Sequence, residues 1–411
     1  MDVYIVSTAM TRFGKLADLS IKDMVRTVVQ DTLEDANAAT GDLDAVYFAN
    51  TAQGYMEGQT FIRGQIALRP LGIQGIPIVN IENACASGTT ALHQAMQHIR
   101  SGAGDTVLAV GAEKLFNRDK GKMFGLFDSG WDIETVEQNK RQLLPLGDGI
   151  DPPPGTISDK PYSVFMDVYA AFARFHMREF GTTQRQIAAV SAKNHRHSVE
   201  NDKAQYRDPM TTDEVLAAPP ISYPLTLPMC APISDGAASA IVCNRAGLRK
   251  LGIARDRAIM IRSCVIQTGV ERDPAEYGKH ISALGARAAY EAAGIGPEDV
   301  SFAEVHDATA VGEIIQSENL QFFAFGDGGP AAERGETELG GRIPINPSGG
   351  LESKGHPIAA TGLGQIHELV TQLRGEAGPR QVEGARVAVA ENGGGLYGTE
   401  EAVAAVTLLS K

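Results

Sequence analysis

The sequence has little of what membrane-spanning, secreted or nucleic-acid-binding proteins require. It contains no stretch of about 18 uncharged apolar residues, so we expect no transmembrane helix. The first residues, MDVYIVSTAMTRFG, reach an arginine and a glycine after a short apolar run and do not resemble a signal peptide. Basic residues number 37 against 50 acidic ones, and the net charge of −13 opposes attraction to nucleic acid or to an acidic membrane surface.

Cysteine is also scarce, and its spacing excludes a zinc site built from paired cysteines. The four cysteines are widely separated and form no CxxC pair; they are Cys85, Cys230, Cys243 and Cys264. We therefore expect free thiols in a reducing, cytoplasmic setting. With 43% hydrophobic and 21% charged residues, the 411-residue chain is typical of a folded protein of about two to three domains.

Short β-branched runs alternate with longer, alanine-rich amphipathic stretches in the first part of the chain. Ser20 followed by Asp23 is typical of a helix start, and Gly41 with Asp42 of a turn. The alternation predicts α/β layers. The expected elements are strand 3–7, helix 21–36, strand 45–48, helix 88–99 and strand 106–110.

The second half of the chain repeats the pattern of the first. Residues 33–50 (LEDANAATGDLDAVYFAN) align with residues 290–307 (YEAAGIGPEDVSFAEVHD) as a helix end, a turn, an acidic residue and a strand. A small-residue helix followed by a strand comes after Cys85 and again after His356. We interpret this as an internal duplication, although two unrelated α/β segments of similar composition would also give it.

Residues 115–161 break this rhythm. They contain charge clusters, the single tryptophan Trp131 and the run DPPPGT at 151–156. The segment is predicted to be a long loop or a small inserted subdomain. A cover for an active site and a surface elaboration fit the pattern equally well.

Cys85 occupies a position suited to a nucleophile. An apolar strand at 76–81 runs into the small-residue turn NACASG, and a helix begins near Ala86. A thiol at the start of a helix faces unpaired N–H groups and the positive end of the dipole, which favour the thiolate and lower its pKa. Gly88 lets that helix pack closely. The alternative is a small buried core residue, a common role for cysteine.

Two histidines occur in matching contexts and suit the needs of such a thiolate. His306 follows a strand in AEVHDATAVGE, and His356 lies in the run GGLESKGHPIAATG that enters a helix. Together they favour a base and an oxyanion donor for Cys85, whereas either alone is more often structural. The run ENGGG at 391–395 follows a strand, and its backbone N–H groups are further candidates for binding an oxyanion.

The other histidines are predicted to have no catalytic role. His195 and His197 in AKNHRHSVEN are expected on a solvated helix face. His93, His98 and His367 fall inside predicted helices.

A specific combination of motifs extends along nearly the whole chain. It comprises VYIVSTAMTRFG at the start, NACASG around Cys85, APISDGAASAIV at 231–242, VHDA at 305–308, GHPIAATG at 355–362 and NGGG near the end. In this combination the chain resembles the thiolase family, and within it the sterol-carrier-protein-2 type. The resemblance implies the α/β thiolase fold, with two duplicated halves in five α-β-α-β-α layers, and at least a dimer. The expected parts are a first half at 1–114 and 162–250, an inserted loop region at 115–161 and a second half at 251–411.

The resemblance also implies a role for each candidate residue. Cys85 corresponds to the acylated nucleophile, and His356 to the residue that activates it and binds a thioester oxygen. His306 corresponds to the residue that completes this first oxyanion hole. A second hole is implied between the backbone N–H of Cys85 and one N–H of the glycine loop, above all that of Gly393. The loop residues concerned are Asn392, Gly393 and Gly394.

The chain lacks the second cysteine that thiolases use as acid and base at the α-carbon of the substrate. The positions that carry it in the family's CxG and HDC motifs are Glu391 and Ala308 here. The proton is then expected from His306, from Glu391, or from water or substrate. The remaining alternative is that the protein catalyses something other than ordinary acetoacetyl chemistry. Glu391 is equally well a solvated loop residue, and Cys230 either approaches the site or belongs to the core.

The leading interpretation is a thiolase-type acyl-CoA C-acyltransferase that cleaves a substituted, branched or aromatic 3-oxoacyl-CoA, or runs the reverse condensation, through an acyl-Cys85 intermediate. Two alternatives remain open. One is a decarboxylative 3-oxoacyl synthase-like condensing enzyme that uses the same cysteine and histidines. The other is a non-catalytic acyl-CoA-binding homologue that supports a partner subunit.

The resemblance also bears on partners and cofactors. It implies a homodimer and a small accessory subunit with a zinc site and an OB fold. It implies no metal and no cofactor beyond the substrate coenzyme A, and no glycine-rich phosphate loop of the nucleotide-binding kind occurs. Arg118, Lys120 and Lys122 are candidates for contacts to the phosphates of coenzyme A, although such a run is also typical of a solvated surface.

Overall fold

The computed structural model describes all 411 residues. Its main sheet contains β1 (Tyr4–Met10), β2 (Ala45–Ala49), β3 (Ile78–Ile81), β4 (Thr106–Glu113), β7 (Gly236–Cys243), β8 (Ile259–Thr268), β9 (Phe302–Glu304), β10 (Val387–Gly394) and β11 (Val403–Ser410). These nine strands run in the order β3-β2-β4-β7-β1-β8-β11-β10-β9. A separate antiparallel pair is formed by β5 (Pro220–Ser222) and β6 (Leu225–Thr226).

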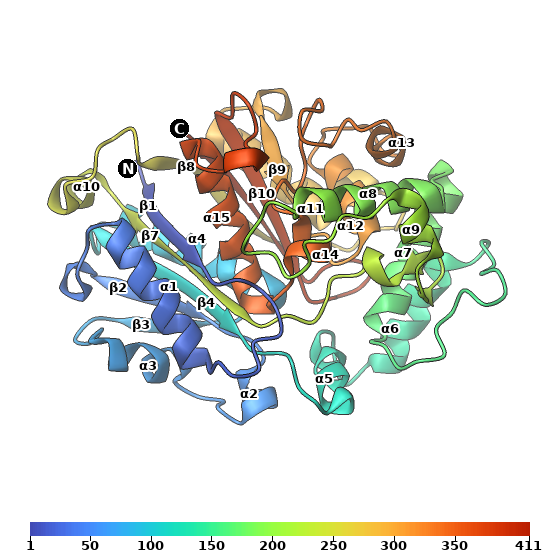
Figure 1. Cartoon of the computed structure of the whole chain (residues 1–411), viewed down its shortest axis with the longest axis horizontal. Coiled ribbons are helices and arrows are strands. Elements are labelled where there is room, and N and C mark those ends of the chain that lie inside the picture. The colour runs from blue at the N-terminus through green and yellow to red at the C-terminus, as the bar shows by residue number, and fades with distance from the viewer.

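Fifteen helices surround and divide this sheet (Figure 1). They are α1 (Ile21–Asp35), α2 (Gln53–Glu57), α3 (Arg63–Leu68), α4 (Ser87–Arg100), α5 (Lys120–Gly125), α6 (Val136–Leu143), α7 (Phe165–Phe180), α8 (Gln184–His197), α9 (Thr212–Ala217), α10 (Arg245–Leu251), α11 (Ile281–Ala293), α12 (Ala310–Asn319), α13 (Gly328–Glu333), α14 (Gly350–Lys354) and α15 (Thr361–Arg374). None of them combines the length and the apolar composition needed to cross a membrane.

The nine strands divide into two half-sheets with the same internal order. In the first, β2 pairs in parallel with β3 and β4, and β7 lies antiparallel between β4 and β1. In the second, β10 pairs in parallel with β9, and β11 lies antiparallel between β10 and β8. The halves join where β1 pairs briefly with β8, with Tyr4 opposite Met260. The second half therefore repeats the first, with the counterpart of β3 reduced to a single parallel bridge between Ala303 and Ile345.

Helices complete five layers around the two half-sheets. α1 and α3 cover the outer face of the first half-sheet, and α11 covers the outer face of the second. α4 and α15 lie between the halves, near the centre of Figure 1. Their apolar side chains share one buried cluster, with Leu92 and Met96 from α4 and Leu363 and Ile366 from α15. The layers confirm the α/β fold with duplicated halves that the sequence predicted.

The two central helices touch where they begin, because each has a glycine as its second residue. A Cβ on Gly88 of α4 would lie 2.7 Å from the carbonyl oxygen of Ala359. A Cβ on Gly362 of α15 would collide with the hydroxyl of Thr89. The contact brings together the two turns that precede α4 and α15, and these turns carry the candidate site.

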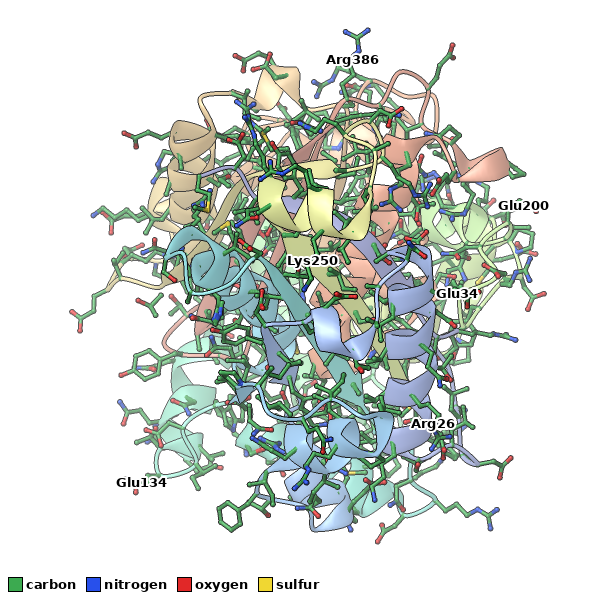
Figure 2. All side chains as sticks on the ribbon, turned by 90° about the vertical axis from the view of Figure 1, so that its left-hand side faces the viewer. Arg26, Glu34, Glu134, Glu200, Lys250 and Arg386 are labelled. Atoms are coloured by element: carbon green, nitrogen blue, oxygen red, sulfur yellow. The ribbon has the colours of Figure 1, made fainter.

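The start of α1 illustrates how local sequence sets an element. The Ser20 hydroxyl accepts from the Asp23 N–H at 3.2 Å, and the Asp23 carboxylate accepts from the Ser20 N–H at 3.1 Å. This capping box begins the helix at Ile21, as the sequence predicted. The polar face of α1 points outward, where Figure 2 labels Arg26 and Glu34 among the surface charges.

The expectation that His195 and His197 lie on a solvated face is wrong. Both lie on α8, but they are only 4% and 5% exposed. α12, α13 and α14 pack against α8. A buried ion pair between Lys193 and Glu313, 2.6 Å apart, helps close this face. The polar side chains of α8 are therefore buried with partners rather than solvated.

Candidate active site

Cys85 lies in a tight turn between β3 and α4. A single 3-10 turn, Ala84–Ala86, leads directly into the helix, and Ala84 has a φ of 47°, in the left-handed region that is unfavourable for residues other than glycine. The hydroxyl of Ser87 holds the turn closed, because it donates to Ala84 O at 2.6 Å and accepts from the Asn83 N–H at 2.8 Å. Cys85 is thereby fixed at the N-terminus of α4.

His356 approaches Cys85 from the matching turn before α15. Its Nε2 lies 3.3 Å from Cys85 Sγ, and its Nδ1 lies 2.7 Å from the hydroxyl of Thr361. That hydroxyl donates its own proton to Pro357 O at 3.1 Å, so it accepts from Nδ1–H. The hydrogen-bond network thus assigns the imidazole proton to Nδ1 and leaves Nε2 free to accept the thiol proton.

The resting sulfur is a thiol, which corrects the expectation of a lowered pKa. Burial, together with the nearby charge of Glu113, raises the pKa of Cys85 to about 12. The N–H groups of Cys85 and Gly395 lower it, but they do not offset burial. Burial also holds the pKa of His356 well below its ordinary value. The pair therefore starts as a thiol and a neutral imidazole, and the proton has to move as the sulfur attacks.

His306 completes a cluster of three reactive side chains. A ring nitrogen of each histidine and the sulfur of Cys85 all lie within 4.8 Å of one another, and the ring of His306 stands perpendicular to that of His356 at 5.1 Å. Asn392 Nδ2 donates to His306 Nδ1 at 3.0 Å, while Asn392 Oδ1 accepts from the Thr89 hydroxyl at 2.9 Å. The proton of His306 therefore lies on Nε2. Burial lowers the pKa of His306 to about 4, so this nitrogen is a neutral donor at pH 7.

The glycine run at the end of β10 passes directly over the nucleophile turn. A Cβ on Gly394 would lie 2.6 Å from Asn83 O and 3.1 Å from Cys85 N, so only glycine permits this approach. The next N–H, that of Gly395, faces the sulfur of Cys85. Gly395 belongs to the run 391–395 that the sequence offered as a source of oxyanion donors, although the resemblance implied Asn392, Gly393 and Gly394. Asn392 acts through its side chain on His306 rather than through its backbone.

Two motifs that serve as family markers in the sequence also position the reactive groups. Ser234, in APISDG, accepts from the His356 N–H at 3.0 Å. Asp307, directly after His306, accepts from the Leu351 N–H at 2.8 Å and so ties the His306 turn to the loop that leads to His356. These positioning roles were not predicted, because nothing in the sequence shows which backbone group each side chain meets.

The structure shows where the residues lie that were candidates for replacing the missing second cysteine. Glu391 is not a solvated loop residue: its carboxylate is fully buried and accepts from the Ser282 hydroxyl and the His306 N–H, both at 3.1 Å. Burial raises the pKa of Glu391 to about 8. Ala308 and Cys230 both line the cavity described next, and the Cys230 thiol donates to Thr226 O at 3.6 Å.

A cavity of about 1020 Å³ opens over Cys85, His306 and His356. The inserted region forms part of its wall through α5 and the segment around it, which includes Met123 and Phe127. The segment 115–161 therefore borders the site, which was one of its two expected roles. α5 and α6 lie along the lower and right-hand side of the molecule in Figure 1.

Cationic side chains also line this cavity. They are Lys15, Arg118 and Lys120. Of the three basic residues singled out in the inserted region, Lys122 is not part of the wall. Lys15 was not predicted, and its ammonium lies 5.6 Å from the centre of the Phe116 ring.

The three reactive side chains have the spacing of a metal site, but their protonation does not suit one. A metal needs bare ring nitrogens and a thiolate. Asn392 fixes the ring proton of His306 on Nε2, so only His356 offers a bare ring nitrogen to the cluster. The cluster therefore suits proton transfer and oxyanion binding better than metal ligation.

Family models match both halves of the chain. The model described as "Thiolase, N-terminal domain" matches residues 3–216. The model described as "Thiolase C-terminal domain-like" matches residues 275–407.

Several curated proteins are similar along nearly the whole chain. An acetyl-CoA acetyltransferase of Methanothermobacter thermautotrophicus is 36% identical over 422 positions, and the alignment covers 100% of both chains. Sterol carrier protein 2 of Homo sapiens is 36% identical over 95% of this chain and 69% of its own length. The benzoylsuccinyl-CoA thiolase subunit BbsB of Thauera aromatica is 31% identical over 93% of this chain and 91% of its own.

A solved structure named "Ltp2-ChsH2(DUF35) aldolase" has the same fold. It superposes with a TM-score of 0.77 and 21% sequence identity, and the match covers 100% of this chain and 97% of the other.

Proposed function

The chain belongs to the thiolase family of acyltransferases, and from this premise we propose that it cleaves a 3-oxoacyl-CoA with coenzyme A, or runs the reverse Claisen condensation, through an acyl thioester on Cys85. The observation that carries the proposal is the 3.3 Å contact between Cys85 Sγ and His356 Nε2, with the imidazole proton fixed on the far nitrogen by Thr361. A nucleophile within reach of an oriented base is the arrangement that acyl transfer requires.

The first half of the reaction forms the acyl-enzyme. Cys85 gives its proton to His356 Nε2 as Sγ bonds to the C3 carbon, and the C3 oxygen becomes an alkoxide held by N–H groups of the Cys85 turn and the glycine run. Collapse of the alkoxide breaks the C2–C3 bond. The acyl group stays on Cys85, and the shortened acyl-CoA leaves as an enolate whose oxygen is held by the N–H groups of His306 and His356.

The second half regenerates the thiol. The enolate takes up a proton at C2, and the free acyl-CoA departs. The sulfur of coenzyme A then attacks the acyl carbonyl and gives up its proton to the group that protonated C2. Cys85 leaves as thiolate and recovers its proton from His356, so that no proton is gained or lost overall.

Aromatic side chains support a substituted, branched or aromatic acyl group. A second cavity adjoins the first and shares Tyr169, His306 and Glu401 with it. Its wall is rich in aromatic rings: Tyr169, Phe172, Phe175, Phe180, Tyr277 and Phe325. This cavity measures only about 80 Å³, so it suits a small apolar branch next to the reacting carbons. A bulkier or aromatic group fits the larger cavity, whose wall also carries the rings of Phe124, Phe127 and Phe165. The Thauera aromatica relative is named for benzoylsuccinyl-CoA, which has an aromatic acyl group.

The proposal extends to coenzyme A and to partners. Lys15, Arg118 and Lys120 are proposed contacts for the phosphates of coenzyme A, since cations on the cavity wall attract that part of the substrate. We propose a homodimer and a small accessory subunit with a zinc site and an OB fold. The name of one relative refers to a subunit, and the name of the solved structure includes a DUF35 component. We expect a cytoplasmic enzyme that needs no cofactor besides its substrate.

Thiolysis with a panel of 3-oxoacyl-CoAs tests the proposal. The expected result is two shorter acyl-CoAs, detected by mass spectrometry, that form only with added coenzyme A and not with Cys85→Ala. Product formation that requires malonyl-CoA and releases carbon dioxide would instead identify a decarboxylative condensing enzyme. Acyl-CoA binding without turnover, unchanged in Cys85→Ala, would identify a non-catalytic homologue.

A further inference from the structure

The proposed reaction needs a proton donor and acceptor at C2. His306, one candidate, is already assigned to the enolate oxygen through its Nε2–H, and burial lowers its pKa to about 4. The position of Ala308 carries no titratable group. The carboxylate of Glu391 is bound to Ser282 and to the backbone of His306, and Glu391 is not part of the cavity wall. A replacement for the absent thiol has to lie elsewhere on that wall, and its assignment rests on the function proposed above.

Glu401 brings a carboxylate to this wall from the turn between β10 and β11. It lines the large cavity together with Cys85, and it borders the aromatic cavity together with His306. A Cβ on Gly393 would lie 2.8 Å from Glu401 Cγ and 3.4 Å from its Oε1. The side chain therefore rests on the glycine strand that passes over the nucleophile.

The carboxylate of Glu401 is buried and nearly without partners. Its side chain is 13% exposed, its Oε2 has no hydrogen bond, and Oε1 receives only a 3.5 Å contact from Gln316 Nε2. The neighbouring Glu400 differs, because it forms a 2.6 Å ion pair with Arg272. Burial raises the pKa of Glu401 to about 7, so both protonation states are populated at neutral pH.

His280 lies beside this carboxylate in a fixed tautomer. Its Nδ1 accepts from the Ser282 N–H at 3.2 Å and from Asn319 Nδ2 at 3.1 Å. The ring proton therefore lies on Nε2, which is 3.5 Å from Glu401 Oε2. Burial lowers the pKa of His280 to about 3, so it is a neutral neighbour that does not neutralise the charge of Glu401.

We propose that Glu401 is the catalytic acid–base residue at C2, in place of the absent second cysteine. In cleavage, the carboxyl O–H gives its proton to C2, the electron pair of the enolate forms the C2–H bond, and Glu401 becomes a carboxylate. This carboxylate takes the thiol proton of coenzyme A as its sulfur attacks the acyl group on Cys85, which restores the starting state. In condensation, the carboxylate removes a proton from C2 of the acyl-CoA as C2 attacks the acyl carbonyl.

Cys230 is the rival that thiolase chemistry suggests, since it is a second thiol on the same wall. Its backbone forms a bridge with Thr309, next to the Ala308 position. Its S–H, however, is directed to Thr226 O, and its side chain packs against a buried apolar cluster. Burial and the charge of Glu352 raise the pKa of Cys230, so the thiol stays protonated and cannot act as the base.

The test separates acylation of Cys85 from proton exchange at C2. The full-length protein, Glu401→Gln and Cys230→Ser are incubated in D₂O with acetyl-CoA, propionyl-CoA or succinyl-CoA. Intact-protein mass spectrometry measures the Cys85 adduct, and deuterium at C2 is measured in the recovered acyl-CoA. We expect Glu401→Gln to reach the same final extent of Cys85 adduct, but more slowly, because Glu401 also returns a proton to the departing coenzyme A thiolate. We expect it to lose C2 exchange by roughly 10²-fold or more, with partial recovery in Glu401→Asp.

The controls make each failure distinct. Glu333→Gln, a matched change on the exposed surface of α13, is expected to keep both activities. Exchange that persists in Glu401→Gln overturns the proposal, as does loss of exchange in Cys230→Ser with Glu401→Gln unaffected. A parent protein that forms the adduct but exchanges no deuterium overturns it as well. A parent protein that forms no adduct contradicts the proposed acyl transfer itself.

Discussion

The two halves of the molecule use matching backbone positions for different purposes. The turn before α4 carries Cys85, whereas the matching turn before α15 follows His356. Ala49, at the end of β2, aligns with His306, after β9. The first half thus supplies one reactive side chain and the second supplies two.

The positions next to these residues keep the same structural role in both halves. Asn50, after Ala49, accepts from the Gln53 N–H at 3.2 Å and holds its following loop. Asp307, after His306, accepts from the Leu351 N–H at 2.8 Å and holds a loop in the second half. The comparison teaches that the repeated scaffold fixes the positions, while the chemistry is set by single side chains placed on them.

Removing the nucleophile should have the largest effect. Cys85→Ala is expected to lower the thiolysis rate on the order of 10⁴-fold or more, because the acyl-enzyme cannot form. The measurement is the rate of acyl-CoA formation from the best 3-oxoacyl-CoA. Cys264→Ala, which removes a buried thiol far from the cavity wall, is the matched control. Equal losses of the thiolysis rate in both variants would contradict the assignment of Cys85 as the nucleophile.

Removing the base, which the second half supplies, should have the next largest effect on the thiolysis rate. His356→Ala is expected to lower the rate by about 10²- to 10⁴-fold, since the Cys85 proton then has no acceptor. Alkylation of Cys85 by iodoacetamide at neutral pH should slow as well, because burial keeps the sulfur protonated. Unchanged alkylation, measured by peptide mass spectrometry, would show that His356 is not the base.

Substitutions of His306 test the role of a residue that has no reactive counterpart in the first half. His306→Ala is expected to lower the rate by roughly 10²-fold, as for the loss of one oxyanion donor. His306→Gln, which keeps an N–H donor, should recover part of the rate. If both variants form the Cys85 adduct as fast as the parent protein and turn over normally, the donor role is wrong.

The paired glycines of α4 and α15 allow the two halves to be compared by the stability of glycine variants. Gly88→Ala and Gly362→Ala are each expected to destabilise the fold by about 1–3 kcal/mol, because the added Cβ meets neighbouring atoms. Gly362→Ala should also reduce activity, since its Cβ presses on Thr89 and Asn392, which orient His306. Denaturant unfolding gives the stability. Equal activity of the two variants at equal stability would show that Gly362 has no separate effect on the orientation of His306.

The smallest expected effect comes from a change that alters only the orientation and tautomer of the His356 ring. Thr361→Val removes the acceptor for His356 Nδ1–H and is expected to lower the rate by roughly 10-fold, because the tautomer with the proton on Nε2 gains population. Thr361→Ser keeps the hydroxyl and should retain most of the rate. A Val variant as active as the Ser variant would show that the tautomer is not fixed by this bond.

Much of the scaffold could be predicted because its signals are local. Ser20 and Asp23 cap α1 within four residues of sequence, and the strand–turn–helix order placed Cys85 at the start of α4. The duplication then placed His356 just before the equivalent turn, Ile358–Ala360. Their 3.3 Å contact arises from the packing of α4 against α15, which a motif can indicate but not measure.

The errors and omissions arise from tertiary burial. His195 and His197 sit in a polar stretch, and segments distant in sequence bury them: the ring of His195 meets Pro228 O, and that of His197 meets Asn346 O. Burial likewise reverses the expected direction of the Cys85 pKa. Glu401 lies in an irregular turn without a motif, so its position on the cavity wall is visible only in the folded chain.

The central claim is that the chain transfers acyl groups through Cys85. Intact-protein mass spectrometry after incubation with a panel of acyl-CoAs and 3-oxoacyl-CoAs tests it most directly, with Cys85→Ala as the comparison. The expected result is a mass increase equal to one acyl group that is absent in Cys85→Ala and disappears when free coenzyme A is added. A folded protein that gains no acyl mass with any of these thioesters, or gains it equally in Cys85→Ala, would contradict acyl transfer through Cys85.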